Sequence, residues 1–341
     1  VDVNLRYGLF FPEKRPFFLE GSENFNLSAS GTVQVVHTRT IVNPLVGLKV
    51  SGKIGDKSRI ASIYAIDELL SPEPGRSGTQ AHFPILRYKY ALGDDSFVGA
   101  ILTGRELNSS FNRVVGTDAS IRMTASSTLD AQALFSQSKP TDIADPTNGQ
   151  SISLKYNYGT RDLDYVIWTN KISQDFSSET GYVTRTGILS FNAYARPKFY
   201  QGDFLPRVDV LLQTNGARDE LSNLWETSNE VAVTNIFSGG QNARFSYFHS
   251  TEIFLGEQFR TDGFLISGGG QFTKEINLSL QYRRANAIFF SATPYQGRGS
   301  RATASLVFQP WSQLEINSSI TYVDFFRSSD NKRIYEYPIG R

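Results

Sequence analysis

The sequence lacks most of the residues that carry metal or thiol chemistry. Its 341 residues include no cysteine, one methionine and three histidines. Without cysteine there can be no disulfide bond, no thiolate metal site and no cysteine nucleophile. The histidines His37, His82 and His249 lie far apart in the chain and lack the spacing of a metal-binding motif such as HxxxH. We therefore expect no metal site and no cofactor.

Long apolar runs and an excess of one charge are also missing. No stretch reaches the ~18 consecutive apolar residues that a membrane-spanning helix needs, so helical membrane proteins are excluded. The 34 lysines and arginines nearly balance the 33 aspartates and glutamates, which gives a net charge of +1. Because the chain has almost no net positive charge to attract a polyanion, we expect no nucleic acid among the partners.

Aromatic residues and glycine are abundant. Phenylalanine, tyrosine and tryptophan make up 13% of the chain, and there are 28 glycines. Aromatic side chains suit the pleated surface of a sheet. From residue 44 onward, polarity alternates over segments of about ten residues, as in SISLKYNY (151–158) and INLSLQYR (276–283). Such alternation is typical of strands whose two faces meet different surroundings.

The connections between these segments alternate between short turns and longer polar loops. Tight turns are expected at glycine-rich sites such as 55–57, 159–161 and 239–241. Longer loops are expected at 68–83, 106–115, 139–148, 173–183, 215–228, 252–262, 285–298 and 325–333. The pattern predicts sixteen strands between residues 44 and 324, another that begins at 334, and one at 1–8. It indicates an antiparallel, up-and-down transmembrane β-barrel of 16 or more strands.

A soluble all-β protein, such as a propeller or a pair of sandwiches, also has short alternating strands. One face of each of its sheets would have to pack against protein, and the polar faces here are too charged for that. In a membrane barrel the apolar face meets lipid and the polar face meets a wet lumen, so a single wall accounts for both. We therefore favour the membrane barrel. The residues expected to face its lumen are Arg122, Lys155, Arg207, Asp209, Arg283 and Glu315.

The segment FFPEKRPFFLEG (residues 10–21) suits neither a helix nor a strand, because Pro12 and Pro16 each remove a backbone donor and restrict the preceding residue. A barrel of about 16–18 strands is wide enough for a channel unless something fills it. We predict that this segment enters the lumen or its rim as an ordered plug; the alternative is a periplasmic turn with an aromatic girdle. The plug candidates are Phe10, Phe11, Glu13, Lys14, Arg15, Phe17, Phe18 and Glu20. The expected organisation is a leading strand and plug-like segment at 1–43, followed by a barrel at 44–341 that is incomplete at both ends.

The run VNLRYGLFFPEKRPFFLEG (residues 3–21) resembles the signature of a family of Gram-negative outer-membrane β-barrel domains of unknown function, which usually follow a family-nine carbohydrate-binding-like domain. SGKIG (51–55), NRVVGTDASIR (112–122) and DFSSETGYVTRTG (175–187) extend the resemblance. One departure is the stretch 37–40, where the family tends to have a basic pair after a serine. The resemblance implies an outer-membrane location in a Gram-negative bacterium, a preceding carbohydrate-binding-like domain and further strands after Arg341. It implies no catalytic residues.

The sequence offers little that suggests catalysis. The acidic pairs Asp94/Asp95 and Asp162/Asp164 could act as acid and base, as in glycosidases, but the first lies in a short turn and the second alternates along one strand face. We therefore expect no enzyme, but a pore, an uptake accessory or an anchor for a carbohydrate-binding-like domain. A structural subunit of a larger envelope complex and a membrane-embedded glycan hydrolase remain alternatives. The expected partners are the lipid bilayer and lipopolysaccharide, with glycans or other envelope proteins as further candidates.

Overall fold

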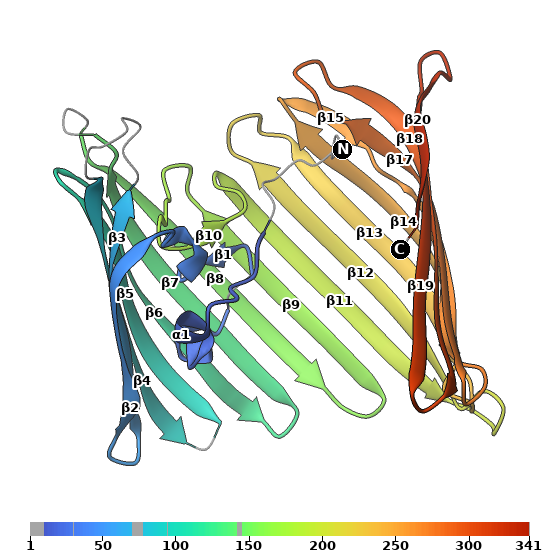
Figure 1. Ribbon diagram of the computed structural model, residues 1–341, viewed down its shortest axis with the longest axis horizontal. Coiled ribbons are helices and arrows are strands. Elements are labelled where there is room, and N and C mark those ends of the chain that lie inside the picture. Colours follow the sequence, from blue (N-terminus) through green and yellow to red (C-terminus); the bar gives the residue numbers. More distant parts are fainter. Residues whose placement is uncertain (1–9, 30, 70–77, 94, 142–144, 341) are drawn as a thin grey trace. The chain divides into compact units, whose positions relative to one another are not determined.

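Figure 1 shows the computed structural model of the chain, which describes residues 10–29, 31–69, 78–93, 95–141 and 145–340. The strand predicted at 1–8 lies outside these residues. The described part contains twenty β-strands, one four-residue α-helix and two short 3-10 helices. The large sheet is antiparallel, with the strand order of an up-and-down β-barrel. This is the fold class that the alternating sequence predicts.

The chain divides into two compact units. The N-terminal unit comprises Tyr7–Asn157 and Trp168–Ser190, and the C-terminal unit includes Tyr158–Ile167 and Phe191–Arg341. The elements up to β10 are α1 (Pro16–Leu19), η1 (Ser22–Phe25), β1 (Val33–Gln34), η2 (Thr38–Thr40), β2 (Pro44–Ile54), β3 (Ser58–Leu69), β4 (Thr79–Gly93), β5 (Ser96–Leu107), β6 (Ser110–Thr124), β7 (Ser127–Lys139), β8 (Thr147–Gly159), β9 (Leu163–Ile172) and β10 (Tyr182–Val183). The remaining strands are β11 (Ile188–Tyr200), β12 (Arg207–Asp219), β13 (Trp225–Ile236), β14 (Asn242–Phe254), β15 (Glu257–Arg260), β16 (Gly263–Gln271), β17 (Ile276–Phe289), β18 (Tyr295–Trp311), β19 (Leu314–Arg327) and β20 (Arg333–Gly340).

The predicted strand count is confirmed when β15 and β16 are taken as one interrupted strand. Both pair with β14: β15 along residues 251–254 and β16 along residues 242–248. Together with β2–β9, β11–β14 and β17–β19 they make sixteen strands between Pro44 and Arg327, and β20 begins at Arg333. The two-residue strands β1 and β10 form a separate small sheet.

Some predicted long loops are wrong. The stretch 106–115 is a tight hairpin, because β5 ends at Leu107 and β6 begins at Ser110, with the left-handed Asn108 (φ 53°) in the turn. The stretch 252–262 similarly contains a hairpin turn at Leu255 and Gly256, both with positive φ. Backbone hydrogen bonds between neighbouring strands do not depend on side-chain polarity. The strands therefore extend beyond the stretches in which apolar and polar residues alternate.

The strands of the N-terminal unit have one buried face, which carries both apolar and polar side chains, and one exposed face, which is mostly apolar. On one face Ala61, Ile63, Phe83 and other apolar side chains are at most 3% exposed. We call this the covered face. The opposite face, the apolar face, carries large exposed side chains: Leu48, Tyr64, Leu86, Tyr88, Leu102, Val115, Phe135, Ile152 and Leu154. What covers the first face is the chain's own N-terminal segment, described below.

The strands of the C-terminal unit have one apolar and one polar face. The apolar face exposes Leu212, Val231, Phe245, Tyr247, Ile266, Leu280 and Ile320. Alternate positions on the same strands, such as Asp209, Glu230, Arg244, Gln281 and Arg283, form the polar face. Within the part of the chain that the structure describes, no helix has the length and apolarity needed to cross a bilayer.

Candidate functional site

Residues 10–43, the N-terminal segment, run across the covered face of the N-terminal unit (blue in Figure 1). The segment is built from α1, η1, β1 and η2, separated by irregular backbone. Pro16 is the first residue of α1, where the missing backbone N–H costs nothing. The expectation that this segment suits no helix is therefore wrong for Pro16–Leu19, because a proline is tolerated at the first helical position.

Two apolar clusters join this segment to the sheet. In the first, Phe18, Phe25 and Ile41 pack on Ala61, Ile63, Ala65, Ala81, Phe83 and Ile85 of β3 and β4. In the second, Leu27, Val33 and Val35 pack on Ile101, Val114, Leu134, Ile172, Phe176 and Ile188. Full burial of such a side chain stabilises by about 1.5–3 kcal/mol, so together the clusters hold the segment on the covered face.

The four phenylalanines of the opening motif have different environments. Phe18 is 3% exposed, and Phe17 meets it edge to face with ring centroids 5.0 Å apart. A Cβ added at Gly47 of β2 would lie 3.0 Å from the Phe17 ring, so the ring packs directly against the backbone of this glycine. Phe10 and Phe11 are 48% and 57% exposed. Phe18 alone of the four is buried between segment and sheet.

Phe10 belongs to an aromatic group at the edge of the segment. Its ring centroid lies 4.8 Å from that of His37 and 5.2 Å from that of Tyr182. Burial lowers the pKa of His37, while the nearby Glu13 acts in the opposite direction. At neutral pH this favours the uncharged imidazole.

The charges of the motif are paired locally. Arg15 contacts the Glu13 carboxylate at 2.7 Å and donates to the carbonyl oxygens of Thr38 and Ile41. The Thr38 hydroxyl also donates to Glu13. Hydrogen bonds from Arg15 above all hold the pKa of Glu13 far below its usual range, against the effect of burial. Because the pKa is lowered on folding, this contribution to stability is present at neutral pH and fades only as the pH falls below the normal carboxyl range.

The other two charges of the motif lie near the surface. Lys14 is exposed. Glu20 contacts Lys49 of β2 at 3.1 Å, and Lys49 also donates to the carbonyl oxygens of Phe17 and Glu20. Lys49 therefore ties the end of α1 to β2.

A buried ion pair lies beneath the middle of the segment. Arg87 of β4 donates to Asp118 of β6 at 2.9 Å, and their side chains are 1% and 0% exposed. A second contact between them, Nη1 to Oδ1, is 2.7 Å long but is not aligned as a hydrogen bond. The pair reaches across β5 at Gly99, where a Cβ would lie 2.6 Å from both groups. Asp118 also accepts the backbone N–H of Ser28, so the sheet's buried charge holds the segment directly.

A second buried carboxylate fixes the end of the segment. Asp67 of β3 is fully buried and accepts the backbone N–H groups of Val42 and Asn43. These two residues immediately precede β2. The segment is thus fixed where it joins the sheet.

The sequence did not predict that a second segment would fold onto the same face. Residues 173–187 form the β9–β11 loop, of which 173–183 were expected to be a long polar loop. Instead β10 pairs with β1, Phe176 is buried in the second cluster, and Thr180 donates to the carbonyl oxygen of Val35. Arg105 of β5 contacts Glu179 of this loop at 2.6 Å. In the sequence this stretch stands out only through Phe176, Gly181 and the family resemblance at 175–187, none of which distinguishes a docked loop from a free one.

Gly181 allows the loop and the segment to approach closely. A Cβ at this position would lie 2.2 Å from the carbonyl oxygen of Gln34. We expect Gly181→Ala to weaken the docking of the loop by about 1–3 kcal/mol, the usual cost of overpacking. Hydrogen exchange should then quicken at the amides of His37 and Thr184, which bond across this contact. Gly52→Ala is the matched control, because a Cβ there meets nothing within 4 Å. Unchanged exchange in Gly181→Ala would contradict the contact.

The structure places the residues predicted to face the lumen on strand faces opposite the exposed apolar side chains. Arg122 shares a face with the buried Asp118, and Lys155 with the buried Ser153. In the C-terminal unit Arg207 contacts Asp209 at 3.0 Å. The remaining contacts are Arg122 with Asp95, Arg283 over the ring of Phe248, and Glu315 with Asn317.

Two members of the acidic pairs considered for catalysis, Asp95 and Asp164, form ion pairs. Asp94 lies outside the described residues, and Asp95 contacts Arg122 at 2.8 Å. Asp164 is held by Arg196 and Lys198 at 2.9 and 2.6 Å, which keeps it in an ion pair. Among the described residues, no group of three or more histidines and acids could hold a metal ion.

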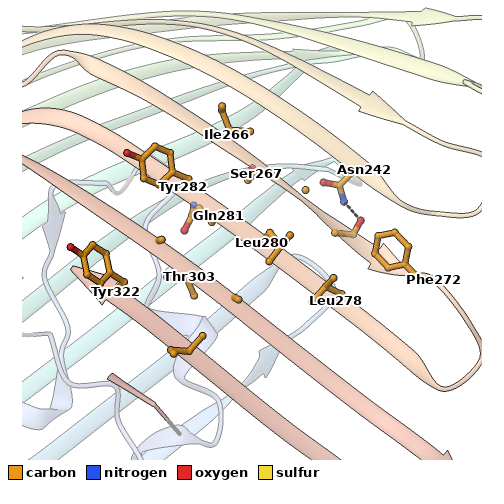
Figure 2. A pocket seen from close by; sticks show the side chains of 15 residues that line it. Asn242, Ile266, Ser267, Phe272, Leu278, Leu280, Gln281, Tyr282, Thr303 and Tyr322 are labelled. Atoms are coloured by element: carbon orange, nitrogen blue, oxygen red, sulfur yellow. Dashed lines mark hydrogen bonds between the residues drawn. The ribbon is translucent and has the colours of Figure 1, made fainter. Parts of the chain in front are cut away.

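The apolar face of the C-terminal unit is hollowed over β16–β19. Figure 2 shows this depression, of about 610 Å³, with the rings of Tyr282 and Tyr322 toward one end and Phe272 and Leu278 toward the other. Asn242 donates to the carbonyl oxygen of Gly269 at its edge. The residues that line it include neither an acid nor a base, so it offers an apolar surface rather than a catalytic site.

Comparisons with known proteins give similarity in structure alone. No protein-family model and no curated protein sequence matches the chain. Among solved structures, OpdQ of Pseudomonas aeruginosa is 11% identical, with a TM-score of 0.45 over 86% of this chain and 98% of its own. OccK2 (OpdF) of the same organism is 10% identical, with a TM-score of 0.46 over 86% and 95%. OccAB4 of Acinetobacter baumannii is 8% identical, with a TM-score of 0.44 over 86% and 93%. The resemblance of residues 3–21 to an outer-membrane family stays a prediction.

Proposed function

We propose that the chain is an outer-membrane β-barrel of a Gram-negative bacterium and acts without catalysis, as a pore whose passage is restricted by the N-terminal segment. The observation that carries this proposal is the contrast between the two faces of the N-terminal unit. One face exposes large apolar side chains such as Leu102 and Phe135, which suit lipid. The other is covered by the chain's own residues 10–43, fixed by Asp67 and Asp118.

A lipid bilayer explains the exposed apolar side chains, because a water-facing sheet with this many large apolar residues would aggregate. Lipopolysaccharide is accordingly a partner of the apolar faces in the outer membrane. The covered face in turn needs no partner, because the N-terminal segment and the β9–β11 loop already fill it. We therefore assign the role of plug to these two segments together.

The experiment uses the absence of cysteine from the chain. Val33 and Val183 are directly opposite each other in the β1–β10 pair, and the neighbouring residues Thr32 and Thr184 carry the hydrogen bond. A non-hydrogen-bonded pair places its Cα atoms ~4.5 Å apart, within the range for a disulfide. Val33→Cys with Val183→Cys should therefore lock the segment to the loop, with no other cysteine to compete.

We expect the oxidised double variant to suppress current steps in planar bilayers and a reducing agent to restore those of the unmodified chain. The single variant Val33→Cys is the control, since it cannot form the internal lock. Equal currents in the oxidised and reduced states would show that the segment does not restrict the passage. If neither the unmodified chain nor variants with a weakened N-terminal segment conduct ions, the proposal of a pore is wrong. An anchor for a neighbouring domain then becomes the better proposal.

A further inference from the structure

Two arginines lie side by side on the polar face of the C-terminal unit. Arg283 of β17 and Arg301 of β18 are direct Cα partners in the antiparallel ladder. Directly opposed like charges destabilise a sheet, because their side chains leave the backbone toward the same face only a few ångströms apart. Such a pair is expected where an opposite charge is supplied from elsewhere.

That opposite charge does not come from the described residues of this chain. None of their carboxylates lies within ion-pair distance of Arg283 or Arg301. Glu230, an acid of the same face, is occupied by Arg244 and the Ser246 hydroxyl. Asp324 of β19 accepts the backbone N–H of Ser300 instead. The two guanidinium groups therefore share a face with Glu230, which already has its partners, whereas Asp324 pairs in register with Ser300 and lies on the opposite face.

The neighbouring positions leave donors and space around the arginine pair. Two positions along the ladder, on the same face, Gln281 of β17 opposes Thr303 of β18, and both are polar. Two positions in the other direction Ala285 opposes Gly299, two of the smallest residues. The guanidinium of Arg283 lies 4.9 Å from the centroid of the Phe248 ring. Stacking on a ring uses the face of a guanidinium, so its N–H edges stay available for an oxyanion.

We propose that Arg283 and Arg301 bind the carboxylate or phosphate group of a small organic anion, with Gln281 and Thr303 as additional hydrogen-bonding groups and the Phe248 ring beside its carbon skeleton. Two planar guanidinium groups can each hold an oxyanion through paired hydrogen bonds. The inference deepens the proposed function, on which it rests, by naming the solute class as anionic. It requires no chemical change of the ligand.

Equilibrium binding tests the site independently of any current. The full chain in detergent micelles is titrated calorimetrically with sodium benzoate and, separately, with inorganic phosphate. We expect binding of at least one probe, and a dissociation constant raised about tenfold or more in Arg283→Gln with Arg301→Gln, because charge-assisted hydrogen bonds are lost. Preference for benzoate would identify a carboxylate solute, and preference for phosphate a phosphorylated one.

Arg284→Gln is the matched control, since Arg284 is the next residue along β17 and opposes Ser300 instead of Arg301. Arg284→Gln should have the same dissociation constant as the unmodified chain for each probe that the unmodified chain binds. Absence of binding by the unmodified chain, or equal binding by the Arg283/Arg301 double variant, would overturn the site.

Failure of this inference and failure of the proposed function can be told apart. A chain that binds benzoate or phosphate without conducting keeps the anion site and loses the pore. A chain that conducts with the same anion preference in unmodified and double-variant forms, and binds neither probe, keeps the pore and loses the site.

Discussion

Replacing Phe18 with alanine is expected to loosen the N-terminal segment from the covered face more than any other single change within the opening motif. Phe18 is 3% exposed, packs with Phe25 and Ile41 against β3 and β4, and carries the Arg15 guanidinium 4.3 Å above its ring. Truncating a buried phenylalanine costs about 3–5 kcal/mol. A loss of ~3 kcal/mol in the local opening free energy corresponds to exchange about 100-fold faster.

Hydrogen exchange at the amides of Leu19 and Glu20 measures this effect, because both close the turn of α1. Phe11→Ala is the matched control: its ring belongs to the same motif but is 57% exposed, so exchange should stay within a fewfold of the unmodified chain. In planar bilayers, Phe18→Ala should also lengthen the open periods of the proposed pore. Equal exchange in the two variants would refute the assignment of Phe18 as the main anchor.

The second large effect is expected at the buried ion pair. Asp118→Ala would leave the Arg87 guanidinium, 1% exposed, without its counter-charge and would remove the acceptor of the Ser28 amide. Breaking a buried pair on one side typically costs about 3–5 kcal/mol. Urea unfolding of the protein in lipid vesicles should show this as a lower free energy of unfolding, with an unchanged dependence on urea.

Two further variants separate the charge effect from general damage to the sheet. Arg87→Met combined with Asp118→Leu removes both charges and should recover much of the loss, because an apolar pair can replace a buried ion pair. Asp95→Ala breaks the partly exposed pair with Arg122 and should cost less than about 1 kcal/mol. If Asp118→Ala costs no more than Asp95→Ala, the buried pair does not hold the segment as the geometry indicates.

Local patterns in the sequence predicted the wall well. Alternation of polarity located the strands around 151–158 and 276–283, and it put Lys155 and Arg283 on the faces opposite the exposed apolar side chains. The same pattern failed at 106–115, where a two-residue turn replaces the expected long loop. There the consecutive strands β5 and β6 pair with each other up to Leu107 and Ser110, because backbone hydrogen bonds form whatever the polarity of the side chains.

The candidate site was predictable only in part. Residues 10–21 stood out because prolines, charges and aromatic rings occur together, but the sequence could not distinguish the buried Phe18 from the exposed Phe11. Phe18 lies on α1, which turns its ring toward β3 and β4, whereas Phe11 precedes α1. The β9–β11 loop was missed altogether, because its docking depends on close backbone approaches at Gly149 and Gly181.

The sequence alone determined the period-two alternation, and with it the antiparallel all-β architecture, since the direction of each side chain along a strand follows from the local backbone. It also determined the absence of thiol chemistry. Only the tertiary structure decided that the Arg87–Asp118 pair is buried under Ser28, and that Arg283 opposes Arg301. Those relations depend on strand register and on contacts between residues far apart in the chain. A one-residue shift in register would separate the same side chains without changing the sequence pattern.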